Sequence, residues 1–197
     1  METKHVRTSG AYVIYKGLFP FQVGPTRKGD KLGVVRLGGH REEDETAQET
    51  AIREVFEESS MIIKLVNSPI TFLKNDWNES AVKIQSSEDI APILIKGTDP
   101  TASTAMYLAF SNTAPVPSSE PCGLLLLSSK DISLICKHKI TLEKFIEQGG
   151  KALISQEINL GLPLEPFPQL HFLGELFEKE ASLMAQFLSG IEPGVDR

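Results

Sequence analysis

Eight carboxylates lie close together between residues 39 and 61, and no other residues of this chain are better placed to do chemistry. They are Glu42, Glu43, Asp44, Glu45, Glu49, Glu54, Glu57 and Glu58. On a helix, the last three of them would fall within about 100° of one another. Like charges at this spacing repel and cost a helix roughly a few tenths of a kcal/mol. A bound cation would remove that cost.

The types of side chain in this stretch favour a hard divalent cation. The nearby candidate ligands are carboxylate oxygens, and no Cys or His is grouped with them. Mg²⁺ and Mn²⁺ prefer such oxygen ligands. The alternative is a solvated acidic face, which is the usual role of a run of charges. The helix alone does not separate these two interpretations.

A helix is expected to present these carboxylates from Thr46 onward. Thr46 and Glu49, three residues apart, form a capping-box signature that predicts the start of a helix. Apolar residues then recur at helical spacing, and we expect this stripe to face the core. The stripe consists of Ala47, Ala51, Ile52, Val55 and Phe56.

The spacing of the whole stretch resembles the Nudix box, G-x5-E-x7-R-E-U-x-E-E-x-G-U, in which U is a bulky apolar residue. The matching residues are Gly39, Glu45, Arg53, Glu54, Val55, Glu57, Glu58 and Met61. The Gly, Glu and Arg matches together have a chance probability on the order of 10⁻⁸ per window at ordinary residue frequencies.

One position departs from this pattern, because Ser60 stands where the family usually has Gly. A glycine there allows a left-handed turn, a conformation that costs another residue roughly 1 kcal/mol. We expect Ser60 to adopt a different turn and to change only the local loop geometry.

The resemblance implies a hydrolase that cleaves a nucleoside diphosphate linked to another moiety, with Mg²⁺ or Mn²⁺ as cofactor. The implied metal ligands are Glu54, Glu57, Glu58 and the carbonyl group of Gly39. Arg53 would orient a neighbouring glutamate, and Glu45 would support this network. A bound metal would neutralise the pyrophosphate and make a water molecule nucleophilic.

A further glutamate outside the box is also expected to act as general base or metal ligand. Many Nudix enzymes place such a residue just before a late strand. Glu120 matches this position best and Glu88 second, and an ordinary surface glutamate is the alternative. One of the box glutamates or Glu120 would accept the proton of the attacking water.

Three basic side chains close to the box are candidates for binding substrate phosphates: Arg36, His40 and Arg41. Arg36 lies within an apolar stretch, where an unpaired charge is costly, so it needs a partner. That partner is either a box carboxylate or a substrate phosphate. For His40, a hydrogen-bonded structural role is an equal alternative.

The implied fold class is α/β, a Nudix-type α/β/α sandwich with a mixed β-sheet. Residues 1–140 would form the Nudix domain, and residues 141–197 a C-terminal helical extension packed on the same domain. Strands are expected at residues 11–15, 21–23, 32–37, 61–66, 70–74, 92–96, 105–110 and 123–127. A short helix is expected from about residue 129.

The extension is expected to contain helices at residues 141–148 and 173–188, separated by an irregular Pro-rich stretch at 160–167. It could cover a sheet edge, form a homodimer contact or shape the substrate pocket. Packing on the core of its own chain is the favoured role.

Length, composition and net charge limit the classes of protein to which this chain could belong. The chain has 197 residues, of which 41% are hydrophobic, and this is enough for one domain with a full core. A net charge of −6 argues against a surface that binds long nucleic acids, so a small nucleotide substrate is the expected partner. With no secretory signal, no apolar run of 18 residues and two cysteines, we expect a cytoplasmic protein with free thiols that does not enter a membrane.

Two other functions compete with hydrolysis. The first is a catalytically silent Nudix domain that senses a nucleotide, although binding alone would not require the full set of box glutamates. The second is isopentenyl diphosphate isomerisation, which the same fold supports but which needs a catalytic cysteine. Cys122 and Cys136 lie late in the chain and in no matching context, so this second function is disfavoured.

Overall fold

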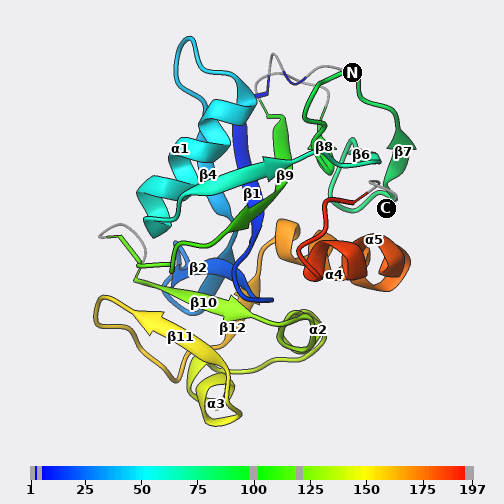
Figure 1. The fold of residues 1–197 in the computed structure, drawn as a ribbon. Coiled ribbons are helices and arrows are strands. Elements are labelled where there is room, and N and C mark those ends of the chain that lie inside the picture. Colours follow the sequence, from blue (N-terminus) through cyan, green and yellow to red (C-terminus); the bar gives the residue numbers. More distant parts are fainter. Residues whose placement is uncertain (1–2, 4–5, 98–101, 119–121, 194–197) are drawn as a thin grey trace.

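The strands of the described part of the chain form two β-sheets. The structure is a computed structural model that describes residues 3, 6–97, 102–118 and 122–193 (Figure 1). The first sheet contains β1 (Thr8–Ile14), β4 (Leu37–His40), β5 (Ile63–Val66), β6 (Thr71–Lys74), β7 (Val82–Ile84), β8 (Leu94–Lys96) and β9 (Thr104–Ser111). The second contains β2 (Phe19–Pro25), β3 (Leu32–Val35), β10 (Gly123–Leu127), β11 (Lys151–Ile154) and β12 (Leu164–Pro166).

Both sheets are mixed. In the first sheet, the order is β4-β1-β9-β8-β6-β7, with β5 paired to β9. The pairs β1–β9 and β6–β8 are parallel, and the other pairs of this sheet are antiparallel. In the second sheet, the order is β11-β10-β2-β3-β12, and only β12–β3 is parallel.

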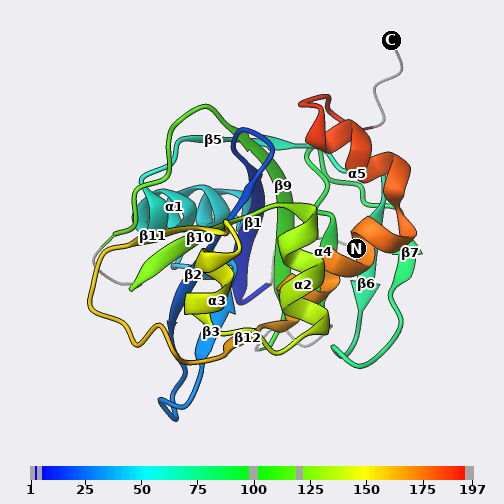
Figure 2. The same ribbon diagram turned by 90° about the horizontal axis from the view of Figure 1, so that it is seen from below.

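Helices cover both faces of the first sheet (Figures 1 and 2). α1 (Ala47–Ser59) lies on one face, and α4 (Pro168–Lys179) and α5 (Ala181–Leu188) lie on the other. The remaining helices, α2 (Ser129–Lys137) and α3 (Leu142–Glu147), lie on the side of the second sheet. Alternation along β1 explains the layering, because Ala11 and Val13 join the apolar cluster under α1. Tyr12 and Ile14 point to the other face, where they join the cluster of α4 and α5. The predicted α/β class with mixed sheet and helical layers is confirmed, and the second sheet is an addition to it.

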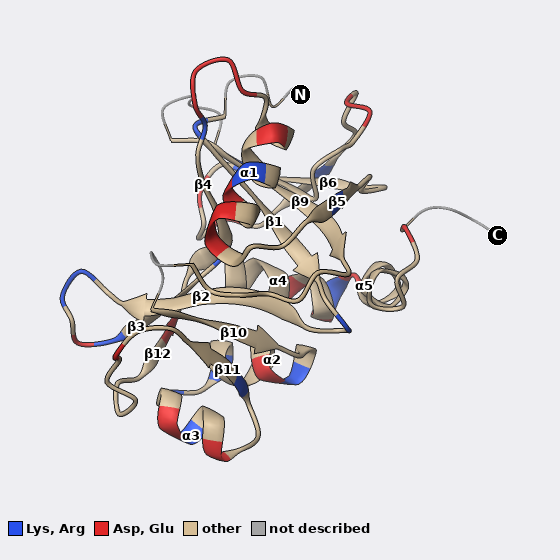
Figure 3. Ribbon diagram, turned by 60° about the vertical axis from the view of Figure 1, so that its left-hand side comes forward, with Lys and Arg blue, Asp and Glu red and all other residues tan. Residues whose placement is uncertain are grey.

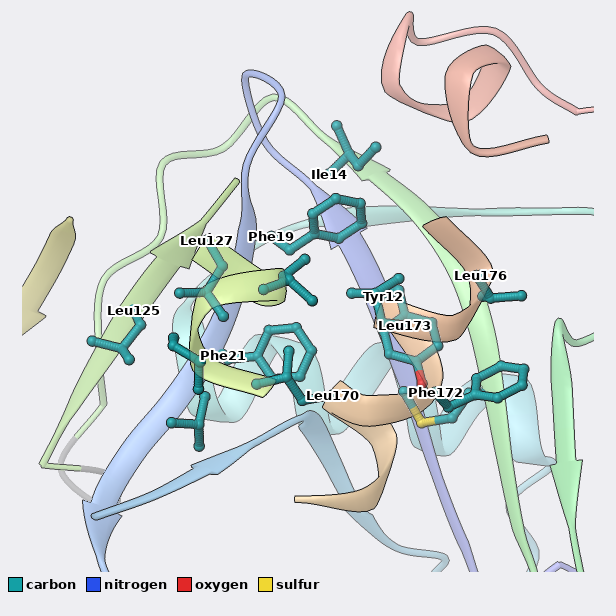
Figure 4. Close-up of a cluster of buried hydrophobic side chains, with 14 of the residues drawn as sticks. Tyr12, Ile14, Phe19, Phe21, Leu125, Leu127, Leu170, Phe172, Leu173 and Leu176 are labelled. Carbon is teal, nitrogen blue, oxygen red and sulfur yellow. The ribbon is translucent and has the colours of Figure 1, made fainter. Parts of the chain in front are cut away.

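The larger apolar cluster lies between the two sheets and the C-terminal helices (Figure 4). Phe19 and Phe21 of β2 and Leu125 and Leu127 of β10 point into it from the second sheet. The rings of Phe172, on α4, and Phe72, on β6, pack edge to face, with ring centroids 5.8 Å apart and planes at 69°.

The C-terminal residues supply strands as well as helices. The Pro-rich stretch predicted to be irregular contains β12, whose Leu164 pairs with Leu32 of β3. A second unpredicted strand, β11, pairs with β10. Pairings between residues this far apart in sequence leave no local signal, which explains why both strands were missed. The domain boundary at residue 140 stays a prediction.

The stretch expected to be one strand at residues 32–37 belongs to two sheets. β3 ends at Val35, which pairs with Gln22 of the second sheet. β4 begins at Leu37, which pairs with Ala11 of the first sheet. Arg36 lies at this crossing point and is buried. The crossing delivers the chain into Gly38, Gly39 and the loop that precedes α1.

Two other expectations about helices were wrong. The single helix predicted at residues 173–188 is two helices that meet at Glu180, whose φ of −124° and ψ of 45° are not helical. On α1, Ala47, Ala51 and Val55 are buried as expected. Ile52 and Phe56, however, are 43% and 54% exposed, because they lie about 100° around the helix from the stripe that meets the sheet.

None of the helices in the described residues is long and apolar enough to cross a membrane.

The end of α1 also differs from expectation. Ser60 follows the helix with φ 55° and ψ 17°, the left-handed conformation that a glycine would adopt, and its N–H donates to the carbonyl oxygen of Phe56 at 2.7 Å. The expectation of a different turn was therefore wrong. The turn has the left-handed geometry typical of glycine although Ser60 carries a side chain.

Replacing Ser60 with Gly should raise the free energy of unfolding by roughly 0.5–1 kcal/mol, because the left-handed conformation is strained for a residue with a Cβ atom. Denaturant unfolding followed by circular dichroism would measure the change. Ser189→Gly is the matched control, since Ser189 also ends a helix but has φ −77°. An equal gain in both variants would contradict a conformational origin.

Candidate active site

The acidic stretch folds into a loop and the helix α1, which packs on one face of the first sheet. Figure 3 shows the acidic residues of this loop and of α1 in red. The predicted capping box is present. The Thr46 hydroxyl accepts from the Glu49 N–H at 3.2 Å, and the Glu49 carboxylate accepts from the Thr46 N–H at 2.8 Å. α1 therefore begins where the sequence predicted, and its remaining glutamates are fixed relative to the loop.

Arg53 holds the carboxylates of this stretch together. Its Nε donates to Glu45 Oε1 at 2.6 Å, and its Nη2 to Glu45 Oε2 at 2.9 Å. Its Nη1 donates to Glu54 Oε1 at 2.9 Å and to Glu57 Oε2 at 3.0 Å. Nη2 also donates to the carbonyl oxygen of His40 at 2.9 Å. These contacts use all the N–H groups of one guanidinium, so one cation offsets the repulsion within the cluster.

Charge pairing within the cluster changes the acidity of its members. Hydrogen bonds from Arg53 lower the pKa of Glu45 to about 2, with smaller contributions from the Glu42 N–H and the Thr50 hydroxyl. The same pairing raises the pKa of Arg53. The Glu45 and Arg53 side chains are 17% and 22% exposed, so solvent screens this pair only partly.

Glu58 lies outside the set of carboxylates that Arg53 binds, and the backbone of β4 engages it instead. The residue is 8% exposed, and its Oε2 accepts from the Gly38 N–H at 2.7 Å. Burial raises the pKa of Glu58 to about 7, against the lowering effect of hydrogen bonds from Gly38 and the Gln22 side chain. Sequence reasoning did not identify Gln22, although it is the one polar residue within Phe19–Val23.

Two glycines let the chain pass close to these carboxylates. Gly38 has φ 139°, and a Cβ there would collide with the Ser9 carbonyl oxygen. A Cβ on Gly39 would collide with the Glu54 carboxylate. The pair therefore provides a cradle that side chains would fill, and Gly39 lies where the sequence placed a candidate carbonyl ligand.

The predicted substrate-binding residues lie in different environments. Arg36 is 7% exposed, its Nε has no hydrogen-bond partner, and its charge faces Glu58 and Glu54. This placement favours the box carboxylate as its partner. His40 is exposed. Arg41 Nη1 donates to the carbonyl oxygen of Glu45 at 2.9 Å, so only part of its donor capacity is used.

The structure says less about the candidate general base and about the two cysteines. Glu120 lies outside the described residues. Its alternative Glu88 accepts from the hydroxyl of Thr3 at 2.7 Å and lines the same cavity, of about 610 Å³, as Glu45 and Arg41. Both cysteines are free and partly buried, and burial raises the pKa of Cys136 to about 11, which disfavours a reactive thiolate there.

The donor chemistry of the box fits a hard divalent cation, since the Glu54, Glu57 and Glu58 side chains and the Gly39 carbonyl all present oxygen ligands. Within the described residues, no three His, Cys, Asp or Glu side chains are arranged to hold a metal ion together. The guanidinium of Arg53 contacts Glu54 and Glu57 instead. The box thus supplies the ligand types, but Arg53 engages two of its glutamates and the Gly38 N–H engages the third.

Comparison with known proteins gives likeness to solved structures only. No protein-family model and no curated protein match the chain. A Nudix-family hydrolase from Clostridium perfringens is 20% identical, covering 73% of this chain and 94% of its own, with a TM-score of 0.47. An Ap4A hydrolase from C. elegans is 14% identical, covering 91% and 98%, with a TM-score of 0.47. A putative Nudix hydrolase from Chromobacterium violaceum is 14% identical, covering 96% and 97%, with a TM-score of 0.44. At these values, we draw no conclusion about activity.

The pairing of Glu45 with Arg53 predicts a pH-dependent contribution to stability. Because the folded-state pKa of Glu45 is about 2 instead of the usual 4.5, this contribution is complete above pH 4.5 and is lost as the pH falls toward 2. Glu45→Gln should therefore lower the free energy of unfolding by about 1–2 kcal/mol at pH 7.

Denaturant unfolding at several pH values would measure this effect, and the difference from the natural chain should shrink below pH 4.5. Glu43→Gln, on the exposed part of the same loop, serves as control and should change stability little at any pH. A difference for Glu45→Gln that is constant from pH 7 to pH 3 would contradict the pairing.

Proposed function

We propose that this chain hydrolyses the pyrophosphate linkage of a nucleoside diphosphate joined to another moiety, as a Nudix hydrolase with Mg²⁺ or Mn²⁺ as cofactor. The observation that carries the proposal is the Arg53 network, which gathers Glu45, Glu54 and Glu57 around one guanidinium at short distances. A solvated acidic face would not need such a network, and Glu54 is only 15% exposed.

Each box residue has a defined task in the proposed reaction. Glu54, Glu57, Glu58 and the Gly39 carbonyl would hold the metal. When bound, the metal would supply charge neutralisation for the pyrophosphate and lower the pKa of a water molecule. Arg53 keeps Glu54 and Glu57 oriented, and Glu45 fixes Arg53. One of the box glutamates or Glu120 accepts the proton of the attacking water.

Substrate phosphates would be bound by His40 and Arg41, which lie next to the cluster. His40 is exposed, and its carbonyl group contacts Arg53. Arg41 lines the cavity of about 610 Å³ that reaches Glu45 and the first residues of α1. Arg36 is buried and its charge interacts with that of Glu58, so its proposed contribution is to the charge around that carboxylate.

One observation favours a second candidate, a nucleotide sensor without catalytic activity. In the described residues no three carboxylates converge on one point, and Glu58 is engaged by Gly38 instead. In a sensor, this arrangement would persist when the nucleotide binds. In a hydrolase, the three glutamates would have to turn toward one another.

Incubation with a panel of nucleoside diphosphate derivatives would decide between these functions. The panel contains nucleoside triphosphates, a nucleotide sugar, dinucleoside polyphosphates and coenzyme A, each with Mg²⁺, with Mn²⁺ and with EDTA. Metal-dependent cleavage of one compound, with products identified by mass spectrometry, is the expected result. Binding without turnover across the panel would contradict hydrolysis and favour the sensor.

Glu57→Gln should lower turnover of the cleaved compound by at least about 10³-fold, because it removes the charge of one proposed metal ligand. The Glu57 side chain is 55% exposed, so the fold should remain intact, which circular dichroism would verify. Glu43→Gln is the matched control and should retain full activity. Turnover near that of the natural chain in Glu57→Gln would remove this residue from the site.

A further inference from the structure

An exposed aromatic side chain borders a hollow on the second sheet. Phe167, between β12 and α4, is one of the large apolar residues that stay exposed, at 36%. The hollow beside it has a volume of about 250 Å³, and we call it the Phe167 hollow. An aromatic ring that borders a cavity can stack on a flat ligand. Besides Phe167, the lining of the hollow includes Gln22, Gly24, Gly33, Val35 and Cys122.

Two glycines that face each other across the sheet make room for the hollow. Gly24 of β2 pairs with Gly33 of β3, so neither strand places a side chain over this part of the sheet. A Cβ atom at Gly33 would lie 2.9 Å from Cε1 of Phe167, so the ring occupies the space above Gly33. Within the described residues, a Cβ atom at Gly24 would meet only the backbone nitrogen and Sγ of Cys122, both at 3.8 Å. The space above Gly24 therefore stays open beside the ring.

The backbone that carries Phe167 is held firmly in place. Pro166 precedes it and Pro168 follows it, and each proline restricts the backbone around it. The Phe167 N–H also donates to the carbonyl oxygen of Val34, on β3, at 3.1 Å. A side chain on a fixed backbone has less freedom to lose when a ligand binds. Phe167 is therefore suited to stacking on an aromatic ligand.

The hollow lies on the face of the second sheet that is turned toward α1. Gln22 and Gly24 are two residues apart on β2, so they share a face. Gln22 pairs with Leu124 of β10, which places Leu124 on the same face. Leu124 belongs to the apolar cluster that also contains Ala51 and Val55 of α1. The hollow thus opens on the side of the helix that carries the box glutamates.

The hollow also borders the segment that leads into the candidate active site. Val35 lines the hollow, and Gly39 follows four residues later, so their Cα atoms are at most about 14 Å apart. Gln22, which lines the hollow too, donates from Nε2 to the carbonyl oxygen of Arg36 at 3.2 Å. A nucleotide whose base lies in the hollow can therefore extend its phosphates toward the box.

We propose that the Phe167 hollow binds the nucleobase of the substrate and that Phe167 stacks on this base. The inference rests on the proposed function, because it takes a nucleoside diphosphate derivative as the substrate. Stacking on an aromatic side chain tolerates any base, since every base has a π-face. A purine offers the larger ring area, so purine nucleotides should bind more tightly than pyrimidine nucleotides. Phe167 is then a specificity-determining residue contributed by the C-terminal part of the chain.

Saturation-transfer NMR with AMP tests this role without turnover, because AMP has no pyrophosphate linkage to cleave. In the natural chain, saturation transfer should be strongest at the base protons H2 and H8. Phe167→Ala should weaken AMP binding about 5- to 100-fold, which corresponds to the loss of stacking on one aromatic side chain. Phe167→Tyr keeps a ring for stacking and should retain the affinity.

Gly24→Ile tests the hollow without changing Phe167. A β-branched side chain suits a strand, and a Cβ atom at this position meets its neighbours at ordinary contact distance, so the variant should fold, which circular dichroism would verify. Its side chain would fill the space above Gly24 and should weaken AMP binding by a similar factor. Leu160→Ala is the matched control, since Leu160 is also exposed, at 39%, but does not line the hollow. None of these variants should change the binding of ribose 5-phosphate, which has no base.

Unchanged AMP binding in folded Phe167→Ala and Gly24→Ile would overturn the inference. Equal affinities of the natural chain for AMP and for ribose 5-phosphate would also overturn it. Neither result bears on hydrolysis, which the panel of nucleoside diphosphate derivatives measures. Base-dependent AMP binding without cleavage of any panel compound would support the hollow as a base site and contradict hydrolysis. The two proposals can therefore fail independently.

Discussion

The candidate site depends on the hydrogen bonds and ion pairs of one guanidinium, that of Arg53. Without it, Glu45, Glu54 and Glu57 would repel one another at the start and along one side of α1. With it, each carboxylate has a partner at 2.6–3.0 Å, and the end of β4 is tied to the helix through the His40 carbonyl oxygen. Bidentate pairing with Glu45 fixes the plane of the guanidinium. The same contacts that stabilise the fold thus keep these acidic side chains ordered.

The second constraint is the crossing of the chain between the two sheets at Arg36. It buries a cation whose charge interacts with Glu58. After Leu37 come two glycines whose missing Cβ atoms leave room for the Ser9 carbonyl oxygen and the Glu54 carboxylate. Glu58 is held by the Gly38 N–H of β4, while Glu54 and Glu57 contact Arg53. The C-terminal residues contribute to this framework, because β12 extends the sheet that contains β2 and β3.

Sequence reasoning succeeded where the determining interactions are local. The capping box fixed the start of α1, and the apolar run at residues 123–127 coincides with β10. It failed where distant parts of the chain decide the outcome, as in β12, which exists through its pairing with β3. Ser60 shows that hydrogen bonding of the helix end can hold a serine in the left-handed conformation. Gln22 was missed because the carbonyl oxygen to which it donates, that of Arg36, lies on another segment of the chain, and a single polar residue in a strand does not reveal its partner.

The central claim, that the box glutamates support attack of water on a phosphorus atom, is tested most directly by cleavage of a substrate in ¹⁸O-labelled water. The account predicts that one phosphoryl product gains a single ¹⁸O atom, that this requires Mg²⁺ or Mn²⁺, and that EDTA abolishes it. The labelled product would also show which phosphorus is attacked. Cleavage that leaves the phosphoryl products unlabelled, or that proceeds equally in EDTA, would contradict the account.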